Sequence, residues 1–217
     1  MPPSEQQLAW VRPPQQARSQ ATLTRILDAA EALLAEKSWE DSAVQEIARR
    51  AGSSVGAFYA RFHDKNGLLR ALQERFLEEA FATADAALDP ERWEGASVAE
   101  IVSEVVAFLV QIHRERGALL RALHLRAATD HDFRARFVHL TRRIAAGLRS
   151  LVLARRAELT HPQPALAAEF SLRIVLAVLL QRLLLGDEVL GARVLSERQL
   201  SAELTRACLA HLGVSSP

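Results

Sequence analysis

The stretch Ser42–Leu69, SAVQEIARRAGSSVGAFYARFHDKNGLL, decides how the rest of the chain is interpreted. Ser42 with Gln45 three residues later predicts the start of a helix, because the two side chains can cap each other's backbone amides. Gly52 predicts the end of that helix, since glycine adopts a positive φ without steric cost. Ser54 then predicts an N-cap for a second short helix. Two short helices joined by a glycine-containing turn are typical of a helix-turn-helix, whose second helix can enter the major groove of DNA.

The second short helix has small and polar side chains on the side that faces away from its aromatic pair. Phe58 and Phe62 are four residues apart and predict the buried side. On the other side, Val55 suits the methyl group of thymine and Tyr59 suits a phosphate oxygen. The candidate DNA-binding residues of the whole stretch are Ser42, Gln45, Ser54, Val55, Gly56, Ala57, Tyr59, Arg61 and Lys65. In an alternative reading, Tyr59 belongs to the core and the nearby cations are merely solvated, because helix-turn-helix geometry also occurs in proteins that never bind DNA.

Composition and charge limit the possible functions. The 217-residue chain has a net charge of +1 and is 49% hydrophobic, so any DNA binding has to depend on a few locally placed cations. The single cysteine, Cys208, excludes an intramolecular disulfide and gives no support to a cysteine-based metal site. The N-terminus has no secretory signal pattern, and the most apolar run, Ile174–Leu185, is too short to span a bilayer. We therefore expect a cytoplasmic protein without a membrane partner.

Helical periodicity runs through most of the chain, and no hairpin dipeptide stands between alternating residues. We therefore expect an all-α fold of about nine helices. Residues 1–17 are rich in Pro and Gln and predict a flexible arm, which is either disordered or lies along DNA. Residues 18–80 predict a helix-turn-helix DNA-binding domain. Residues 81–217 predict a helical domain for ligand binding and dimerisation.

Several helix ends are predicted from residues that cap helices. Asp64, Ser97 and Ser196 are suited to N-caps, and Gly213 is suited to the left-handed C-cap position. The helix that starts at Asp130 or His131 is predicted to reach about residue 159.

Nothing in the sequence predicts an enzyme. It contains no glycine-rich phosphate loop, no His-Glu-x-x-His motif and no cysteine pair, and its seven histidines are scattered. An isolated histidine is common on helical surfaces and in cores, so no catalytic residue, metal ligand or cofactor is expected.

One set of residues matches a known family without gaps. The matching residues are RILDAA at 25–30, IARRAG at 47–52, SVGAFY at 54–59, Phe62, Lys65 and Leu68. On these residues, Thr24–Leu69 resembles the N-terminal domain of the TetR family of transcriptional repressors. Two positions depart from the family pattern, since Ser38 stands where a helix-ending glycine is usual and Ser53 where a buried valine is usual.

The resemblance implies roles for both parts of the chain. It implies that Ser54 to Arg61 form the recognition helix, with Tyr59 and Lys65 at phosphates. It also implies that the C-terminal helices sense a ligand and form a dimer.

The helix predicted over Ala165–Leu185 is apolar nearly all round, so it needs a cover on both sides. We expect this helix and the one over Ser196–Leu212 to pair with their copies in a two-fold interface, although an ordinary core is the alternative. Such a dimer would place two recognition helices about 34–36 Å apart, matching successive major grooves of a palindromic operator. The candidate dimer residues are Phe170, Ile174, Val178, Gln181, Leu200, Leu204 and His211.

A ligand pocket is predicted between the helices over Val98–Arg114, Asp132–Leu159 and Ala165–Leu185, because helical bundles hold ligands in their middle. The large inventory of Leu and Phe favours an apolar or aromatic effector. The helix over Asp64–Ala87 belongs to both predicted domains, so it is the expected lever for a ligand-driven population shift. The candidate lining residues are Trp93, Phe108, His113, Phe137 and His139.

We therefore predict a dimeric repressor that is released from a palindromic DNA operator by a small, largely apolar effector. An activator of the same fold is one alternative. A helical protein-interaction module without DNA binding is another, and a helical enzyme is disfavoured by the missing catalytic cluster.

Overall fold

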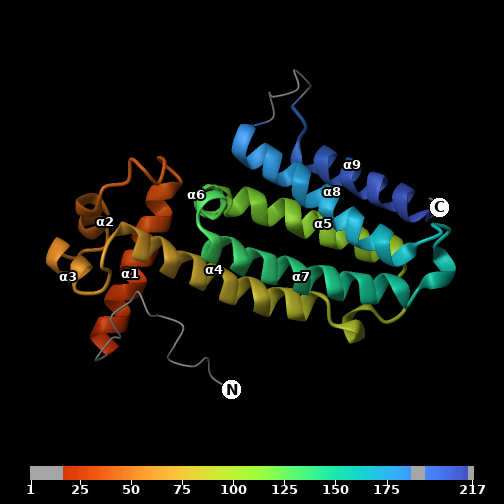
Figure 1. Ribbon diagram of the computed structural model, residues 1–217, viewed down its shortest axis with the longest axis horizontal. Coiled ribbons are helices and arrows are strands. Elements are labelled where there is room, and N and C mark those ends of the chain that lie inside the picture. The colour runs from red at the N-terminus through yellow and green to blue at the C-terminus, as the bar shows by residue number, and fades with distance from the viewer. Residues whose placement is uncertain (1–16, 187–193, 215–217) are drawn as a thin grey trace. The chain divides into compact units, whose positions relative to one another are not determined.

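The computed structural model describes residues 17–186 and 194–214, and this part of the chain consists of helices and loops without a β-strand (Figure 1). The all-α prediction is confirmed. The predicted arm, residues 1–17, lies outside the described residues except for its last position. No helix of the described part is long and apolar enough to cross a membrane. The α-helices of this part are α1 (Ala17–Leu34), α2 (Val44–Arg50), α3 (Val55–Tyr59), α4 (Lys65–Ala87), α5 (Val98–Glu115), α6 (Gly117–Thr129), α7 (His131–Leu153), α8 (Pro164–Leu185) and α9 (Glu197–Leu212). Two short 3-10 helices are η2 (Pro90–Trp93) and η3 (Arg156–Glu158).

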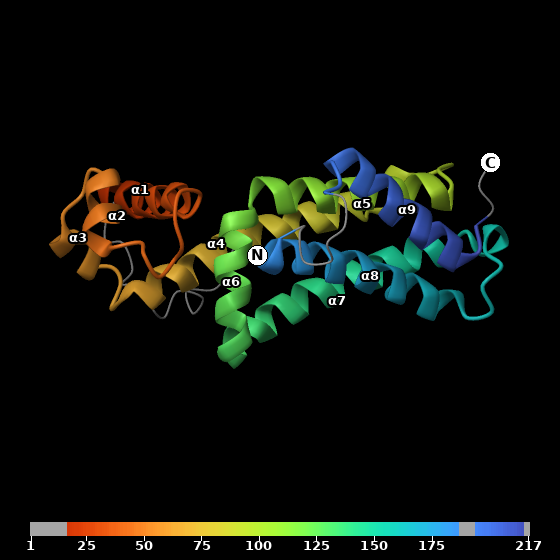
Figure 2. The same ribbon diagram turned by 90° about the horizontal axis from the view of Figure 1, so that it is seen from above.

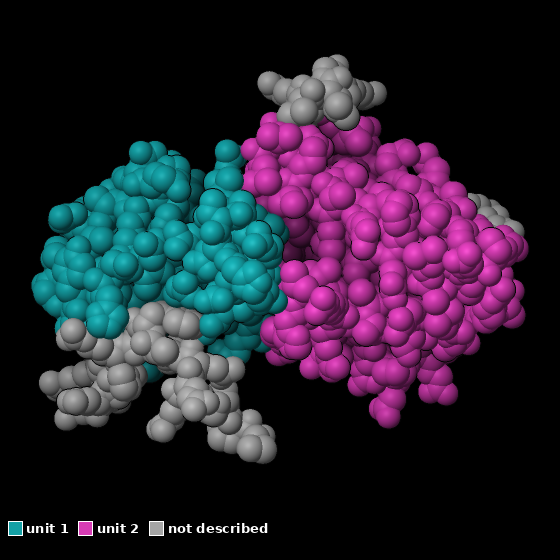
Figure 3. Space-filling model, viewed as in Figure 1, with its two compact units in different colours: residues 1–79, 118–136 teal, residues 80–117, 137–217 magenta. Residues whose placement is uncertain are grey.

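The chain forms two compact units (Figure 3). Unit 1 consists of the described residues up to 79 together with 118–136, and unit 2 consists of 80–117 together with the described residues from 137 onward. Helices α4 and α7 each contribute residues to both units. Unit 1 therefore includes α6 from Ala118 onward and the start of α7, which the sequence-based division at residue 80 assigns to the second domain.

Unit 1 has a core of large side chains from its first four helices and from the turn between α3 and α4. Ile26, Ile47, Phe58, Phe62 and Leu68 are all completely buried. Phe58 and Phe62 contact each other with ring centroids 5.1 Å apart, which confirms the buried side that their spacing predicted.

The turn between α2 and α3 follows the predicted chemistry. Gly52 has a φ of +59°, in the left-handed region that favours glycine. Ser54 is the N-cap of α3, and its hydroxyl accepts a hydrogen bond from the amide of Ala57 at 3.0 Å. Asp64 likewise accepts from the amide of Gly67 at 2.7 Å, as expected of the N-cap at the start of α4.

The capping box predicted at Ser42 was wrong. The N-cap of α2 is Ala43, which makes no side-chain cap. The hydroxyl of Ser42 instead donates to the carbonyl oxygen of Ser38 at 2.8 Å, within the preceding turn. A serine hydroxyl has one proton to donate, and a nearby unpaired carbonyl competes with the helix end for this side chain.

Unit 2 is a helical bundle in which α9 packs against both α5 and α8, as Figure 2 also shows. The predicted caps of this unit are confirmed. Ser97 and Ser196 each form a reciprocal capping box at the start of α5 and α9, and Gly213 ends α9 with a φ of +71°.

Helix α7 ends at Leu153, earlier than the predicted end near residue 159. The following segment is held by contacts with the start of α5. The Arg155 guanidinium donates to carbonyl oxygens of the loop before α5, and the Glu158 carboxylate accepts the amide of Val98 at 2.8 Å. Glu158 and Val98 are 60 positions apart, so no local pattern predicts that this segment leaves the helix.

Candidate nucleic-acid interface and interior cavity

Helix α3 presents one side to the core and the other to solvent. Phe58 is buried, whereas Tyr59 is 49% exposed and contacts it edge-to-face with ring centroids 5.2 Å apart. The phenol of Tyr59 is therefore oriented by packing while much of its surface remains accessible. The predicted DNA-binding residues that are exposed or partly exposed on or next to α3 are Ser54, Val55, Gly56, Ala57 and Tyr59.

Gly56 is not required by the fold itself. Its φ is not positive, and a Cβ built at Gly56 would meet nothing closer than the Ser54 hydroxyl oxygen, at 3.8 Å. An alanine would therefore fit here without disturbing the rest of unit 1. The missing side chain instead lets another molecule approach the backbone of α3 closely.

The two predicted DNA-binding residues near the start of α2 differ in accessibility. Gln45 is exposed, but Ser42 is only 1% exposed and donates its hydroxyl proton to Ser38. Ser42 therefore lies in the interior, where it holds the turn before α2, and Gln45 is the accessible member of the pair.

Lys65 contacts the turn after α1. Its ammonium donates to the carbonyl oxygens of Trp39 and Glu40, the latter at 3.1 Å, and lies 4.8 Å from the centroid of the Trp39 ring. Burial lowers the pKa of Lys65. Through these hydrogen bonds, Lys65 stabilises the turn that precedes α2. Arg61 is partly exposed, and its guanidinium donates to the carbonyl oxygen of Ala57 at 3.2 Å.

Ion pairs within α2 and between α2 and the turn after α1 neutralise two cations near the helix-turn-helix. Lys37 pairs with Glu46, and Arg50 pairs with both Glu36 and Glu46. Because these pairs are accessible to solvent, they contribute little to stability but fix the position of α2. Arg49, at the end of α2, is exposed.

A second polar cluster in unit 1 joins α4, α6 and α7. One carboxylate oxygen of Asp130 accepts the amides of Asp132 and Phe133 at 3.0 and 3.3 Å, so Asp130 caps the start of α7. The other oxygen accepts from Arg70 of α4 at 2.9 Å and from Arg126 of α6 at 3.1 Å. Burial raises the pKa of Asp130, but the amide of Phe133 and the two guanidinium groups outweigh it, and the pKa is lowered overall.

Phe133 lies at the centre of this cluster. Its ring is completely buried, with the Arg70 and Arg126 guanidinium carbons 5.1 and 5.9 Å from its centroid. Its carbonyl oxygen accepts from the amide group of Gln73, a buried side chain of α4, at 3.0 Å. The sequence indicated Asp130 as a helix start, but its partner on α4, Arg70, lies 60 positions away and carries no local signal.

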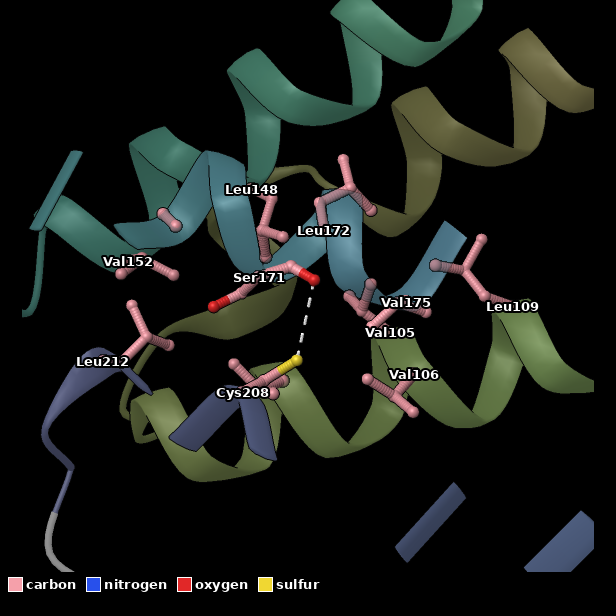
Figure 4. A pocket seen from close by; sticks show the side chains of 12 residues that line it. Val105, Val106, Leu109, Leu148, Val152, Ser171, Leu172, Val175, Cys208 and Leu212 are labelled. Atoms are coloured by element: carbon pink, nitrogen blue, oxygen red, sulfur yellow. Dashed lines mark hydrogen bonds between the residues drawn. The ribbon is translucent and has the colours of Figure 1, made fainter. Parts of the chain in front are cut away.

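Unit 2 contains an interior cavity between α5, α7, α8 and α9 (Figure 4). The space open to the centre of a water-sized sphere is about 20 Å³, which is room for about one water molecule. Its only polar side chains are Ser171 and Cys208, and the Cys208 thiol donates to the Ser171 carbonyl oxygen at 3.7 Å. Burial raises the pKa of Cys208, so this thiol is neutral. The aliphatic lining residues are Val102, Val105, Val106, Leu109, Leu148, Val152, Ala168, Leu172, Val175 and Leu212.

The five residues predicted to contact a ligand do not line this cavity. Trp93 is buried, with its indole N–H donating to the carbonyl oxygen of Ala87 at 2.7 Å, and Phe108 is 40% exposed. His113 bonds the carbonyl oxygen of Leu109 through Nδ1 at 2.8 Å. The two remaining residues are the partly exposed Phe137 and the exposed His139. The sequence predicted a pocket between the helices that correspond to α5, α7 and α8, and the structure adds α9 to the cavity wall.

Helix α8 has an apolar face that unit 2 leaves exposed. Phe170 is 44% exposed, and its ring lies 5.4 Å from that of the partly exposed His211 on α9. By contrast, Leu200 and Leu204, predicted for the same interface, are buried in the core of unit 2. The partly exposed members of the predicted interface on α8 are Ile174, Val178 and Gln181.

Two exposed leucines at the ends of the same helix were not predicted. Leu166 is 55% exposed and Leu185 is 62% exposed. Leu166 precedes Phe170 by four residues, and Leu185 follows Gln181 by four, so the helical spacing that selected the other residues could also have found this pair.

Residues 26–72 match the family described as bacterial regulatory proteins, tetR family. The HTH-type transcriptional regulator YvdT of Bacillus subtilis (strain 168), itself uncharacterised, is 27% identical over 93 residues, which cover 42% of this chain. The same match spans 46% of that relative's length.

Solved structures with the same fold cover nearly the whole chain. One assigned to the TetR family, from Mesorhizobium loti, is 20% identical with a TM-score of 0.70 and covers 92% of this chain and all of its own. A transcriptional regulator from Rhodococcus sp. Rha1 is 21% identical with a TM-score of 0.68, covering 89% of this chain and 99% of its own. FadR of Bacillus subtilis, solved in complex with stearoyl-CoA, is 16% identical with a TM-score of 0.64, covering 87% of this chain and 98% of its own. All of these relatives are transcriptional regulators and not enzymes, as the sequence led us to expect.

Proposed function

We propose that this chain is a repressor that binds a palindromic operator and is released by a small effector. Its N-terminal helix-turn-helix domain belongs to the TetR family of bacterial regulatory proteins. The observation that carries the proposal is the outer side of α3. Its accessible residues combine a packed, half-exposed Tyr59 with a glycine that the fold does not need. A regulator of transcription acts on chromosomal DNA, so we place the protein in the bacterial cytoplasm.

The accessible residues of α3 fall into two roles toward DNA. Gly56 and Ala57 allow the helix to lie close to base edges, and Val55 can contact a thymine methyl group. Tyr59, and the exposed Gln45 of α2, can donate to phosphate oxygens. Ser42 and Lys65 act indirectly in this proposal, because their hydrogen bonds to Ser38, Trp39 and Glu40 hold the turn that positions α2.

We further propose that the protein is a homodimer formed through α8. Leu166, Phe170 and Leu185 are large apolar side chains exposed along one helix, and Ile174 and Val178 lie between them. A contiguous apolar surface of this kind typically marks an interaction site in a soluble protein. A two-fold axis through it would duplicate α3 and match the two halves of a palindrome.

Release from DNA requires a connection between unit 2 and α3. Helix α4 follows the helix-turn-helix and continues into unit 2, so it is the proposed lever. Within unit 1, Asp130 ties α4 to α6 and to the first turn of α7. A ligand that is bound better by one arrangement of these helices would shift the population toward that arrangement. FadR, of the same fold, was solved with stearoyl-CoA, and this supports a largely apolar effector here.

The decisive experiment is selection of bound duplexes from a random pool by the full chain, followed by affinity measurements on the selected site. We expect a palindrome with half-sites about one helical turn apart. Tyr59→Phe, which removes only the hydroxyl, should weaken binding about tenfold, because a hydrogen bond to a charged phosphate is lost.

Leu125→Ala is the matched control, because Leu125 is a 46% exposed residue of unit 1 that lies on α6. It should bind like the wild type. If no sequence is enriched, the chain is a protein-interaction module instead. If a single unpaired site is enriched, the two-fold dimer is wrong.

A further inference from the structure

Glu74 of α4 carries a carboxylate that is hydrogen-bonded at only one of its two oxygens. Its Oε1 atom accepts a hydrogen bond from the guanidinium of Arg136 on α7, and the two side chains form an ion pair. Its Oε2 atom is buried and has no hydrogen-bond partner. Only 14% of the Glu74 side chain is exposed. An ionised carboxylate with an unsatisfied oxygen is costly in the interior of a protein, so this arrangement needs an explanation.

A second carboxylate of unit 1 has the opposite environment. Both oxygens of Asp130 accept hydrogen bonds. Burial opposes the ionisation of both residues, but at Asp130 the donors outweigh burial and the pKa is lowered. At Glu74 burial outweighs the ion pair with Arg136, and the pKa is raised. As the pH falls, Glu74 therefore takes up a proton before Asp130 does.

The charged groups that act on Glu74 come from α7 and from α4 itself. Arg136 of α7 and Arg70 of α4 favour the ionised carboxylate, and Glu78 of α4 opposes it. Arg126, the cation that α6 contributes nearby, pairs with Asp130 instead. The ionised form of Glu74 is therefore maintained mainly by Arg136, which donates the hydrogen bond to its Oε1 atom.

Glu74 belongs to the set of side chains through which α4 contacts α7 within unit 1. Arg70, Gln73 and Glu74 are spaced to lie on one side of α4, and their partners lie at the N-cap and in the first two turns of α7. Arg136 is also the residue at which the part of α7 that belongs to unit 1 ends. The ion pair of Glu74 is thus the member of this set next to the point where α7 enters unit 2.

We propose that Glu74 is a proton-sensitive residue that controls the contact between α4 and α7 in unit 1. When its carboxylate takes up a proton from solvent, the ion pair with Arg136 is lost, whereas the ion pair between Asp130 and Arg70 remains. Mild acid therefore weakens one contact between the two helices and leaves the other. The inference goes beyond the proposed function and rests on it only for the consequence at the operator. There the proton acts as a second signal, because α4 directly follows the helix-turn-helix.

The direct test follows the carboxyl carbon of Glu74 by NMR while the full chain, labelled with ¹³C-glutamate, is titrated with acid. Glu74→Gln identifies the signal by its absence. We expect the signal to titrate above the ordinary glutamate pKa of about 4.3. Arg136→Met removes the cation and should move the titration to a pH about 1 unit higher, whereas Arg136→Lys keeps a cation and should titrate close to the wild type.

The same proton should change the stability of the fold. Because the pKa of Glu74 is raised in the folded protein, its ionised form destabilises the fold at neutral pH, and this penalty disappears as the pH falls through the folded pKa to the ordinary one. Glu74→Gln has a neutral side chain of the same shape, so it should unfold about 3 °C above the wild type at pH 7. The difference should close by about pH 4.

Glu78→Gln is the matched control, because it removes the same charge from an exposed position one turn further along α4. It should unfold within about 1 °C of the wild type at pH 7.

Operator binding measures the functional consequence. At pH 7 Glu74→Gln imitates the protonated residue, and we expect it to bind the selected operator about fivefold more weakly than the wild type, the lower end of typical coupling between sites. This difference should also close in acid, when the wild type becomes protonated.

Two results would overturn the proposal: a Glu74 signal that titrates at or below the ordinary pKa, or a titration that Arg136→Met does not move. Equal operator affinities of wild type and Glu74→Gln at pH 7 would overturn the consequence for DNA binding. If no operator is selected, the proposed function fails, and the NMR titration and the unfolding temperatures still decide whether Glu74 responds to protons as stated.

Discussion

The two units of this protein differ in the hydrogen bonds of their almost completely buried polar side chains. Among the described residues, three polar side chains are almost completely buried: Ser42 and Gln73 in unit 1 and Ser171 in unit 2. Ser42 and Gln73 each donate a hydrogen bond to a backbone carbonyl oxygen, at 2.8 and 3.0 Å, whereas the Ser171 hydroxyl has no partner. The almost completely buried polar side chains of unit 1 are therefore hydrogen-bonded, whereas that of unit 2 is not.

The pairing in unit 1 agrees with its proposed role. A helix that reads DNA has to be presented in a fixed orientation, and satisfied polar contacts favour a single arrangement.

The largest expected effect comes from breaking the polar cluster of unit 1. Asp130→Ala removes the cap of α7 and leaves Arg70 and Arg126 without their shared carboxylate. We expect the free energy of unfolding to fall by about 3 kcal/mol, the sum of a lost N-cap and lost charged hydrogen bonds. Urea unfolding measures it.

The control for this prediction is Asp132→Ala, in the same helical turn. The Asp132 side chain is 74% exposed, and its removal should change stability by less than about 0.5 kcal/mol. Equal losses in the two variants would mean that the Asp130 cluster does not hold unit 1 together.

The next effect tests the comparison directly, because the same substitution should have opposite signs in the two units. Ser42→Ala leaves the Ser38 carbonyl oxygen without its donor and should destabilise the protein by about 1 kcal/mol. Ser171→Ala removes a hydroxyl that has no partner and should stabilise it by about 1 kcal/mol. Thermal unfolding of both variants decides the point, and a destabilising Ser171→Ala would show that its hydroxyl is already bonded.

A smaller effect on stability, coupled to a loss of function, is expected at Gly56. Gly56→Ala replaces a helical glycine whose Cβ has room, so stability should rise by about 0.5–1 kcal/mol. If α3 approaches DNA through this position, the added methyl group should also weaken operator binding. If the variant is more stable and its affinity for the operator equals that of the wild type, Gly56 does not lie in the DNA interface.

The smallest expected effect is the change in the stability contribution of Asp130 with pH, which is absent near neutral pH and develops only in acid. Its pKa in the folded protein is below its ordinary value, so its contribution to stability is complete above the ordinary pKa of about 3.9 and is lost as the pH falls through the folded pKa. The stability difference between wild type and Asp130→Asn should therefore be constant from pH 7 to about pH 5 and shrink below about pH 4. Urea unfolding across this range provides the measurement, and a difference that is unchanged in acid would contradict the assigned role.

Much of the fold could be predicted because helix ends obey local chemistry. Ser54, Ser97 and Ser196 cap helices through amides three residues on, and Gly213 needs only its own backbone freedom. Phe58 likewise followed from its spacing to Phe62. All of these interactions lie within a few residues of chain, where sequence spacing fixes the distance in space.

The failures have two other causes. The segment after α7 makes a contact 60 positions away, between the Glu158 carboxylate and the amide of Val98. The Ser42 hydroxyl bonds a competing nearby acceptor, the carbonyl oxygen of Ser38, and not the end of α2. Leu200 and Leu204 looked like interface residues until the packing of α9 placed them in the core. Each outcome was decided by which acceptor or neighbour came nearest, and a one-dimensional pattern does not contain that information.

By itself, the sequence determined that this protein is all-α and has a helix-turn-helix, since hydrophobic period, caps and glycine act over one or two turns. It also determined which side of α3 faces outward. Only the tertiary structure decided that Lys65 faces the turn after α1, that Asp130 binds α4, and that Ser171 lies unpaired in an aliphatic cavity. The physical reason is that burial and hydrogen bonding of a side chain depend on groups brought together from distant parts of the chain.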